Sequence, residues 1–417
     1  MIDFTIPAGI QQTRARVAAF IDEHVLPAEA EIGARPFFDI VADLQAQARK
    51  RGLWCPFIPT EWGGMGLGHL ANAVVQVEVG RSHLAAWAMN CMGPQDATML
   101  TLLDHGTQEQ KERFLVPLVN AERRICFSMT ERAAGADATG MRTTAVQVEG
   151  KGEAGGGDWI LNGEKWFSSS ASISDYALVM ARTDPDAPRH RQFTTFLVEL
   201  PDPGYQIIRD VPTLHEAVER RYPGDNTGGH AEVRIRDLRV PHRNVIGEVG
   251  GGFAMGQHRL GYGRIRHGMW SIARAQRALD LAARHALERE TFGAPLADRQ
   301  GIQWMLADCA RDLYLARLMV LHIAYKMEHG LDISQENSMA KNFVADMLSS
   351  VVDTALQIHG ALGYTMDTPL AAWYAEVRMQ HLVDGPDEVH RWRIGRNVLA
   401  AQRKHGSTAS AAGGDLF

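Results

Sequence analysis

The sequence predicts an α+β protein of several domains, with helical regions at both ends and a β domain between them. Residues 10–125 carry helical periodicity, residues 125–246 carry short β segments, and helical patterns return after Gly252. Because the strands follow one another without intervening helices, the middle region favours an antiparallel sandwich or barrel over a doubly wound sheet. We place the domains at 1–124, 125–246 and 247–404, with a flexible, small and polar tail at 405–417.

The N-terminal region is predicted to be helical from its apolar spacing and its end signals. Residues 11–32 are amphipathic and stop near Gly33, and residues 37–51 form a second helix. Thr107 is followed three residues later by Gln110, which is the order of a capping box and starts another helix.

The middle region is predicted to form strands because β-branched and aromatic residues alternate between Gly-rich or Pro-rich turns. The β segments are 143–150, 158–170, 175–183, 192–200, 205–211 and 230–241. A polar insertion at 214–229 has no assigned role.

The C-terminal region is predicted to be a bundle of long helices. Residues 302–327 carry two apolar columns, four residues apart and each repeated every seven residues, and residues 340–358 repeat the arrangement. Such columns lie on one helix face and pack into a core. The run Gly261-Tyr262-Gly263 predicts the start of a helix over 265–288, with Arg264 at its N-terminus, where the helix dipole disfavours a cation.

The composition excludes several classes of protein. The chain has 417 residues, a net charge of −6, 45% hydrophobic and 22% charged residues, so it is neither disordered nor a general nucleic-acid binder. It contains no membrane span and no secretion signal at its start, which makes a cytoplasmic location the expectation. The four cysteines form no CxxC pair and are expected to be buried thiols. No histidine spacing suits a metal, and His258 and His267 are expected to be packing or surface residues.

The segment Asp384-Gly385-Pro386 interrupts an apolar helical run and precedes a new helix. The local physics allows two interpretations. Asp accepts hydrogen bonds from the first free N–H groups of a helix, and Pro suits the first turn, so Asp384 can be an inert cap. A carboxylate in an apolar, water-excluding wall can instead be a catalytic base.

Four spaced motifs carry a family resemblance. Residues 130–137 read TERAAGAD, 165–170 read KWFSSS, 289–300 read RETFGAPLADRQ and 357–364 read QIHGALGY. They resemble the TExxxGSD, KWWITNG, RxxFGxPLxxxQ and QIxGGxG motifs of the acyl-CoA dehydrogenase family, over about residues 10–404. The resemblance implies that family's fold, with helical, β and helical domains.

The resemblance also implies FAD as the cofactor. Met129 and Thr130 would hold the flavin ring, Trp166 would pack beside it, and Ser168 would hydrogen-bond near its N5 atom. The FAD of a neighbouring subunit would be bound by Arg289, Thr291, Phe292 and Gln300, with Gln357 and Gly360 near its ADP half. Pro386 and Glu388 complete the implied cofactor set. Ala136 stands where the family has a Ser near the substrate and the flavin phosphates, and no metal is implied.

The implied reaction is α,β-dehydrogenation of an acyl-CoA thioester to a trans-2-enoyl-CoA. Asp384 would take the α-proton while the β-hydrogen leaves as hydride to flavin N5. Arg264 would lie beside the thioester and the base, Gly385 would contact the substrate, and the Asp384 N–H would help to polarise the thioester carbonyl. Most members carry Glu at this position. The Asp resembles a branch linked to 4-hydroxy, longer or branched acyl-CoAs.

The resemblance further implies a role in fatty-acid β-oxidation, an electron-transferring flavoprotein as acceptor, and a homodimer or homotetramer. Two alternatives stay open. One is an acyl-CoA oxidase or flavin monooxygenase on the same scaffold. The other is a non-catalytic acyl-CoA-binding protein in which Asp384 is only a cap.

Overall fold

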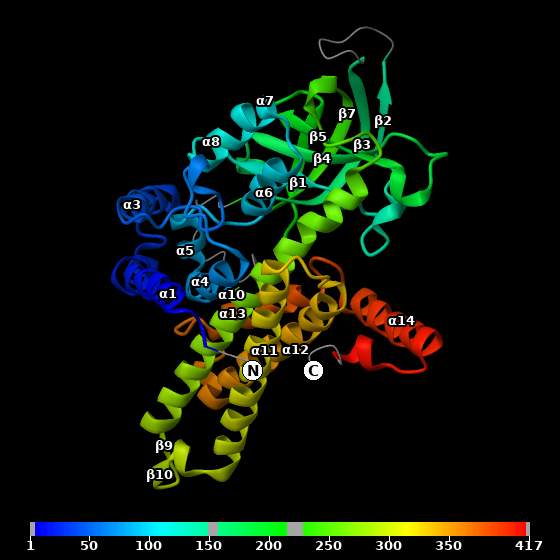
Figure 1. The fold of residues 1–417 in the computed structure, drawn as a ribbon. Helices are drawn as coiled ribbons and strands as arrows, with labels where there is room; N and C mark the ends of the chain where they lie inside the picture. Colours follow the sequence, from blue (N-terminus) through cyan, green and yellow to red (C-terminus); the bar gives the residue numbers. More distant parts are fainter. Residues whose placement is uncertain (1–4, 149–156, 215–227, 414–417) are drawn as a thin grey trace.

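The computed structural model describes residues 5–148, 157–214 and 228–413. Helices from the first third of the chain, a β-sheet and a set of long C-terminal helices form three parts that pack against one another (Figure 1). The predicted order of helical, β and helical regions is confirmed. The polar insertion at 214–229 falls almost entirely outside the described residues.

The N-terminal part consists of short helices around one apolar core. They are α1 (Ala8–Phe20), α2 (Leu26–Ala28), α3 (Phe37–Lys50), α4 (His69–Val79), α5 (His83–Ala88), α6 (Gln95–His105), α7 (Gln108–Gln110) and α8 (Val116–Val119). A π-helical turn at Ile21–Val25 joins α1 to α2, so the predicted helix over 11–32 is continuous for most of its length. Thr107 and Gln110 form the predicted capping box, in which each side chain accepts a hydrogen bond from the other residue's backbone N–H.

The middle part is a single hydrogen-bonded sheet of eight strands. The strands are β1 (Ile125–Ser128), β2 (Thr144–Gln147), β3 (Trp159–Ser169), β4 (Tyr176–Arg182), β5 (Phe193–Glu199), β6 (Tyr205–Asp210), β7 (His230–Val240) and β8 (Val245–Ile246). Their order is β6-β7-β3-β2-β4-β5-β8, with β1 paired to β4. β4 pairs in parallel with β1 and β2, and the other neighbours are antiparallel. The expected sandwich or barrel is therefore one continuous, mainly antiparallel sheet.

The C-terminal part is the predicted bundle. Its helices are α10 (Gly252–Glu288), α11 (Gln300–Glu328), α12 (Ser334–His359), α13 (Leu370–Val377) and α14 (Asp387–His405). The predicted apolar columns of α11 face the core, where Cys309, Leu313 and Val320 are buried. This packing buries an apolar stripe on each long helix.

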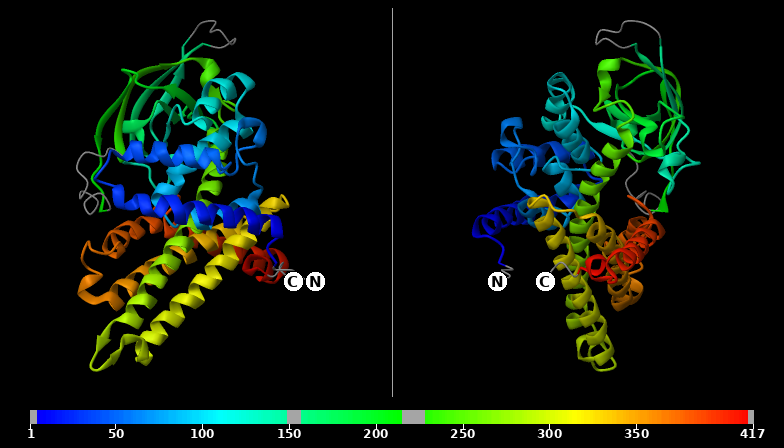
Figure 2. Two further views of the ribbon diagram at one scale, coloured as in Figure 1. Left: turned by 90° about the vertical axis from the view of Figure 1, so that its left-hand side faces the viewer. Right: turned by 45° about the vertical axis from the view of Figure 1, so that its right-hand side comes forward.

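The helix α10 connects the parts. Its 37 residues make it about 55 Å long, from the edge of the sheet to the far end of the bundle. The outer ends of α10 and α11 project as an arm (Figure 2), and the short hairpin β9 (Glu290–Thr291) and β10 (Ala294–Pro295) closes its tip.

The chain end differs from its prediction. Residues 409–412 form a 3-10 turn in which Ala411 is 5% exposed, and the Gln335 side chain donates a hydrogen bond to the Ala411 carbonyl over 2.8 Å. The small residues of this segment are compact enough to fold back onto α12. The expected tail therefore includes a turn that contacts α12.

Two expectations from composition hold in the described part of the chain. All four cysteines are buried and free, and burial raises the pKa of Cys55 to about 12 and that of Cys126 to about 11. None of the helices within the described residues combines the length and apolar character needed to cross a bilayer.

Candidate active site

Asp384 lies in a chain reversal between the 3-10 turn Arg378–His381 and α14. Its backbone is left-handed, with a φ of 55°, and Gly385 follows with a φ of 99°. A non-glycine residue in this region carries about 1 kcal/mol or more of strain, and such residues cluster at functional sites. The N-cap of α14 is Pro386, and no side chain caps this helix end. Asp384 is therefore not the helix cap that its local sequence allowed.

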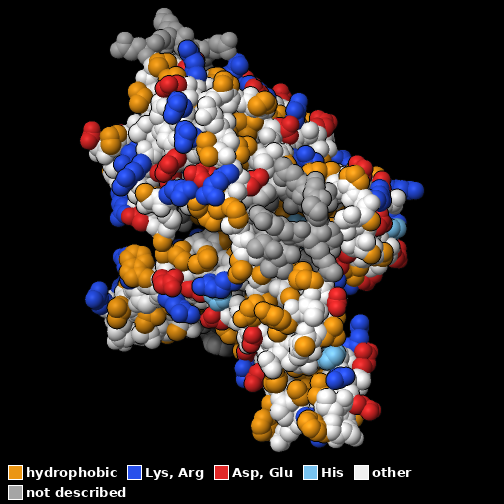
Figure 3. Space-filling view, turned by 180° about the vertical axis from the view of Figure 1, so that it is seen from behind, with side chains coloured by type: hydrophobic (Ala, Val, Ile, Leu, Met, Phe, Trp, Pro, Cys, Tyr) orange, Lys and Arg blue, Asp and Glu red, His pale blue; other side chains and the backbone are white. Residues whose placement is uncertain are grey.

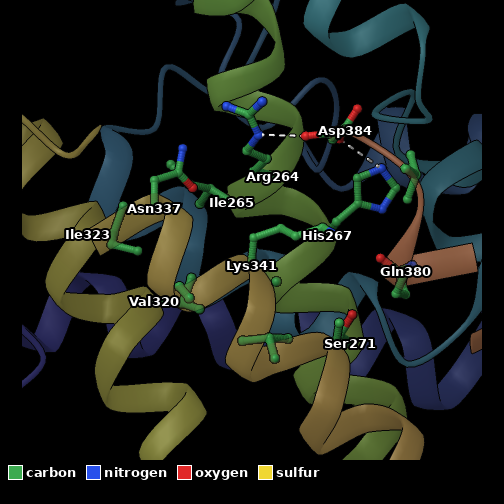
Figure 4. A pocket seen from close by; sticks show the side chains of 15 residues that line it. Arg264, Ile265, His267, Ser271, Val320, Ile323, Asn337, Lys341, Gln380 and Asp384 are labelled. Atoms are coloured by element: carbon green, nitrogen blue, oxygen red, sulfur yellow. Dashed lines mark hydrogen bonds and ion pairs between the residues drawn. The ribbon is translucent and has the colours of Figure 1, made fainter. Parts of the chain in front are cut away.

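The carboxylate of Asp384 lies against α10 instead (Figure 4). A Cβ added to Gly263 would lie only 3.1 Å from Asp384 Oδ2, so glycine permits this approach. His267 Nε2, one helical turn further along α10, lies 3.7 Å from Oδ2. The Asp384 side chain is 16% exposed, and no lysine or arginine among the described residues forms an ion pair with it.

The backbone of Asp384 is held from two sides. Its carbonyl oxygen accepts hydrogen bonds from Arg264 Nε at 3.0 Å and from His390 Nε2 at 3.2 Å. Its N–H has no hydrogen-bond acceptor among the residues that the structure describes. The peptide between Asp384 and Gly385 is thus fixed, while the N–H of the preceding peptide stays available for a ligand.

Arg264 reaches Asp384 from the middle of α10, which begins at Gly252. The prediction that Arg264 opens a helix is therefore wrong. The glycines in this stretch allow close packing: α11 approaches Gly268 through Val320, and Asp384 approaches Gly263. Burial lowers the pKa of Arg264, and the charge of Asp384 opposes that shift.

A pocket opens beside Asp384 between α10, α11 and α12 (Figure 4). Its wall is mixed. The apolar lining includes Ile265, Val320, Ile323, Val344 and Val383, and the polar lining includes Arg264, His267, Ser271, Asn337, Lys341 and Gln380. Lys341 Nζ forms an ion pair with Asp387 Oδ1, at the start of α14, over 2.9 Å. The pocket therefore offers an apolar surface together with several polar groups, and the Asp384 carboxylate is one of them.

His390 is expected to make the protein less stable in mild acid. It is 3% exposed, and burial, followed by repulsion from Arg264, lowers its pKa to about 4. In the unfolded chain, histidine has a pKa of about 6.5, so on acidification the unfolded chain binds a proton at a higher pH than the folded protein does. The free energy of unfolding therefore keeps its full value above about pH 6.5 and decreases as the pH falls toward 4. The loss is on the order of 3 kcal/mol at pH 4.

Denaturant unfolding of the wild type and of His390→Gln between pH 7 and 4.5 measures this effect. The Gln amide keeps a donor for the Asp384 carbonyl but does not titrate. We expect the variant to lose less stability over this range than the wild type. An equal loss in both proteins would show that His390 carries no such linkage.

The motif residues of the sheet lie together at the end of β1. The Trp166 backbone N–H donates to the Thr130 carbonyl over 2.8 Å, and both side chains are partly exposed, while Met129 is buried. The Arg132 guanidinium lies 3.6 Å from the centre of a Trp166 ring. Ala136 is exposed in the loop that follows.

Ser168 does not fit its predicted role. Its side chain is fully buried, and its hydroxyl is paired with the Ser128 hydroxyl at 2.9 Å, behind the strand. A bulge between Lys165 and Ser168 and a left-handed Phe167 shift the expected alternation of the strand. Ser169 is partly exposed, and its hydroxyl is paired with His230 Nδ1 at 2.8 Å.

The remaining motif residues gather at the far end of the bundle. Arg289, Thr291, Phe292 and Gln300 surround the tip of the arm, and Phe292 is 100% exposed. Gln357 and Gly360 end α12 at the same place, where the His285 and His359 rings stack 4.3 Å apart. Arg264 and Arg289 are about 37 Å apart along α10. The structure therefore does not bring these residues to Asp384 within one chain.

The sequence interpretation missed Gly263 and His267 as site residues. His267 follows Arg264 by three positions, which places both on neighbouring parts of one helix surface. A helix extended back to Gly252 would have revealed that spacing.

The comparisons with known proteins agree with this architecture. Models of the acyl-CoA dehydrogenase N-terminal, middle and C-terminal domains match residues 8–122, 126–216 and 250–399. The probable acyl-CoA dehydrogenase FadE2 of Mycobacterium tuberculosis is 35% identical over 99% of this chain and 100% of its own length. Acyl-CoA dehydrogenase family member 11 of Gallus gallus is 34% identical, over 94% of this chain and 51% of that protein, so the chain spans about half of that relative.

A solved structure of a similar protein has the same fold. A putative acyl-CoA dehydrogenase from Mycobacterium abscessus superimposes with a TM-score of 0.85 at 35% identity, covering 95% of this chain and 99% of the other. The fold is that of the acyl-CoA dehydrogenases, and the chain belongs to that family of oxidoreductases. It is an acyl-CoA dehydrogenase, an FAD-dependent oxidoreductase that acts on acyl-CoA.

Proposed function

We propose that Asp384 is the base that removes the α-proton of the acyl-CoA, so that the enzyme forms a trans-2-enoyl-CoA. The observation that carries this proposal is a nearly enclosed carboxylate that caps no helix and faces a pocket with apolar and polar walls. Its own N–H has no acceptor within residues 5–148, 157–214 and 228–413. We also assign the chain to the branch of the family with Asp in place of Glu.

The free N–H of Asp384 is the proposed donor to the thioester oxygen. An α-proton next to a thioester is a weak acid, so the carbonyl must be polarised as negative charge develops. Arg264 and His390 hold the Asp384 carbonyl, which fixes the peptide that follows Asp384 and steadies the turn in which its N–H lies. Arg264 therefore acts on the base through its backbone, and its charge lies beside the developing enolate.

The residues at the end of β1 fit a flavin. Thr130, Trp166 and Ser169 are partly exposed, with the Arg132 guanidinium over the Trp166 ring and the Ser169 hydroxyl paired with His230 Nδ1 at 2.8 Å. Pro386 and Glu388 lie two and four residues beyond Asp384. When bound, FAD supplies the acceptor for the hydride that leaves the β-carbon. We propose that Thr130 and Ser169 orient the flavin and that Trp166 covers its ring.

The shorter side chain of Asp384 needs a compensating approach of the helix. A misplacement of about 1 Å can cost on the order of a hundredfold in rate, and Asp is one methylene shorter than Glu. Gly263 lets α10 and the carboxylate come close together. We propose that this glycine sets the position of the base.

Gly263→Ala is expected to have opposite effects on activity and stability. The added Cβ would lie 3.1 Å from Asp384 Oδ2 and displace the carboxylate, slowing flavin reduction by about tenfold or more. Ala in place of Gly within a helix raises the free energy of unfolding by up to about 1 kcal/mol. Stopped-flow reduction and denaturant unfolding measure the two effects. An unchanged reduction rate would contradict the proposed role of Gly263.

The projecting arm supports the proposal of a homo-oligomer. Phe292, Leu287 and Trp304 are 100%, 69% and 63% exposed there, and the arm carries hydrophobic side chains on its surface (Figure 3). We propose that a second copy of the chain covers the tip, and that Arg289, Thr291, Phe292, Gln300, Gln357 and Gly360 contact the partner subunit's FAD. Sedimentation analysis of Phe292→Asp, compared with the wild type, tests this contact.

Anaerobic mixing of the holoenzyme with acyl-CoA esters of different chain lengths tests the proposed function. Bleaching of the oxidised flavin, with release of a 2-enoyl-CoA, supports dehydrogenation, whereas binding without bleaching would overturn it. We further propose an electron-transferring flavoprotein as the acceptor. Rapid oxygen consumption after bleaching would instead indicate an oxidase.

A further inference from the structure

His267 is a half-buried titratable group that the proposed mechanism does not use. It projects from α10 toward Asp384 (Figure 4), and its side chain is 22% exposed. Within the described ranges its imidazole forms no hydrogen bond, and its one aromatic contact is an edge contact with Trp270 at 6.3 Å.

The other carboxylates near His267 already have cationic partners. Asp96 of α6 forms a buried ion pair with Arg266, and Glu376 of α13 lies 2.5 Å from Arg274. No lysine or arginine among the described residues forms an ion pair with Asp384, and His267 Nε2 lies 3.7 Å from its Oδ2. A small rotation of either side chain would bring these atoms to hydrogen-bond distance.

We infer that His267 accepts from Asp384 the proton that Asp384 has taken from the substrate, and that this transfer restores the carboxylate. The inference rests on the proposed role of Asp384 as base. His267 would be a second proton acceptor in the same site, next to Asp384 on the wall formed by α10.

The transfer balances within this chain. The Cα–H bond of the substrate breaks and a bond forms between that proton and Asp384 Oδ2, while the hydride leaves the β-carbon for the FAD of the proposed reaction. The Oδ2–H bond then breaks as Nε2–H forms, so Asp384 becomes a carboxylate and His267 an imidazolium. His267 must begin as the tautomer with its proton on Nδ1. The final proton leaves from His267 to water through the pocket.

The surroundings of His267 keep its acceptor free at neutral pH. Burial is the main cause that lowers its pKa, and Arg266 lowers it further, while Asp384, Asp96 and Glu376 raise it. Arg264 and Lys341 also line the pocket, and Lys341 is paired with Asp387. In the wild type, proton transfer from Asp384 to His267 should therefore slow only as the pH falls below about 6.5, because a protonated His267 cannot accept another proton.

Two measurements on the holoenzyme separate this role from a structural one. An acyl-CoA with sulfur in place of the β-carbon cannot lose hydride, so deuterium uptake at its α-carbon in D₂O reports removal and solvent exchange of the proton. Single-turnover flavin reduction with an ordinary acyl-CoA reports proton removal without exchange. The variant is His267→Gln. The control is His258→Gln, which removes a histidine on the same helix that also lies 3.7 Å from an aspartate, Asp104, at an exposed site.

We expect His267→Gln to lower deuterium uptake by about tenfold or more and single-turnover reduction by less than about threefold, with no change in the control. In the wild type, the rate of deuterium uptake should fall at low pH, and this fall should be absent in His267→Gln. Equal losses in both measurements would overturn the inference and leave His267 as a positioning residue. Unchanged deuterium uptake would also overturn it. A wild type that neither exchanges the α-proton nor bleaches would overturn the proposed function itself.

Discussion

Asp384→Asn is expected to slow the anaerobic reduction of the flavin by acyl-CoA by about 10²-fold to 10⁴-fold, the usual contribution of a positioned general base. The amide has nearly the same shape, so the hydrogen bonds from Arg264 and His390 to the residue 384 carbonyl remain. The carboxylate is enclosed against Gly263, and no other unpaired carboxylate lines the pocket in the described part of the chain. No neighbouring carboxylate can therefore replace the lost base.

The control for this variant is Asp104→Asn. Asp104 also lies 3.7 Å from a histidine of α10, but its side chain is 36% exposed and lies outside the pocket. Its reduction rate should match the wild type. The content of bound FAD should be unchanged in both variants. A reduction rate for Asp384→Asn within about threefold of the wild type would exclude Asp384 as the base.

Lys165→Met is expected to lower the free energy of unfolding by about 3–5 kcal/mol, because it leaves one charge of a buried pair without its partner. Lys165 Nζ lies 2.9 Å from Glu131 Oε1, and the two side chains are 0% and 2% exposed. Lys165 also donates to the Met129 carbonyl over 2.9 Å. Burial lowers the pKa of Lys165 to about 8, although Glu131 opposes this shift.

The pair also fixes the segment that carries Met129 and Thr130. The Glu131 carboxylate accepts hydrogen bonds from the backbone N–H groups of Arg142 at 2.6 Å and Thr143 at 3.0 Å. The variant should therefore lose FAD affinity together with stability. Denaturant unfolding and flavin titration measure the two losses.

An exposed ion pair serves as the comparison. Asp308→Asn removes the partner of Arg311 on α11, where the side chains are 69% and 60% exposed, and should cost less than about 1 kcal/mol. The double variant Glu131→Leu with Lys165→Met removes both buried charges and should recover part of the lost stability. A loss below about 1 kcal/mol for Lys165→Met alone would contradict this account.

Much of the fold followed from local pattern. The strands and the helices α11 and α12 were predictable from the spacing of their apolar residues. Alternating apolar residues share one face only in a strand, and apolar residues repeated every seven positions share one face only in a helix. The capping box of Thr107 and Gln110 was predictable because its hydrogen bonds lie within one turn. These features depend on neighbours that are close in the sequence.

The errors arose where tertiary packing overrode local signals. Gly261 and Gly263 indicated a helix start, but α10 runs through them because its glycines admit Val320 and Asp384 from other elements. Ser168 was assigned to the accessible face, but a bulge turns its hydroxyl toward Ser128. A bulge depends on strand pairing and is not visible in the pattern of one strand.

The choice between cap and base could not be made from the sequence. The residues Asp384-Gly385-Pro386 satisfy the rules for a helix start, and the same residues can form a left-handed turn that aims the carboxylate at α10. His267 stayed unnoticed for the same reason, because its importance comes from a contact across 117 positions of sequence.

Deuterium uptake at the α-carbon tests the role of Asp384 most directly, because it follows the proton itself. Wild-type and Asp384→Asn holoenzymes are mixed in D₂O with the acyl-CoA that has sulfur at its β-position, and the ester is recovered for mass analysis. The account predicts steady deuterium uptake in the wild type and a rate at least about a hundredfold lower in Asp384→Asn. Uptake at the wild-type rate in Asp384→Asn would contradict it.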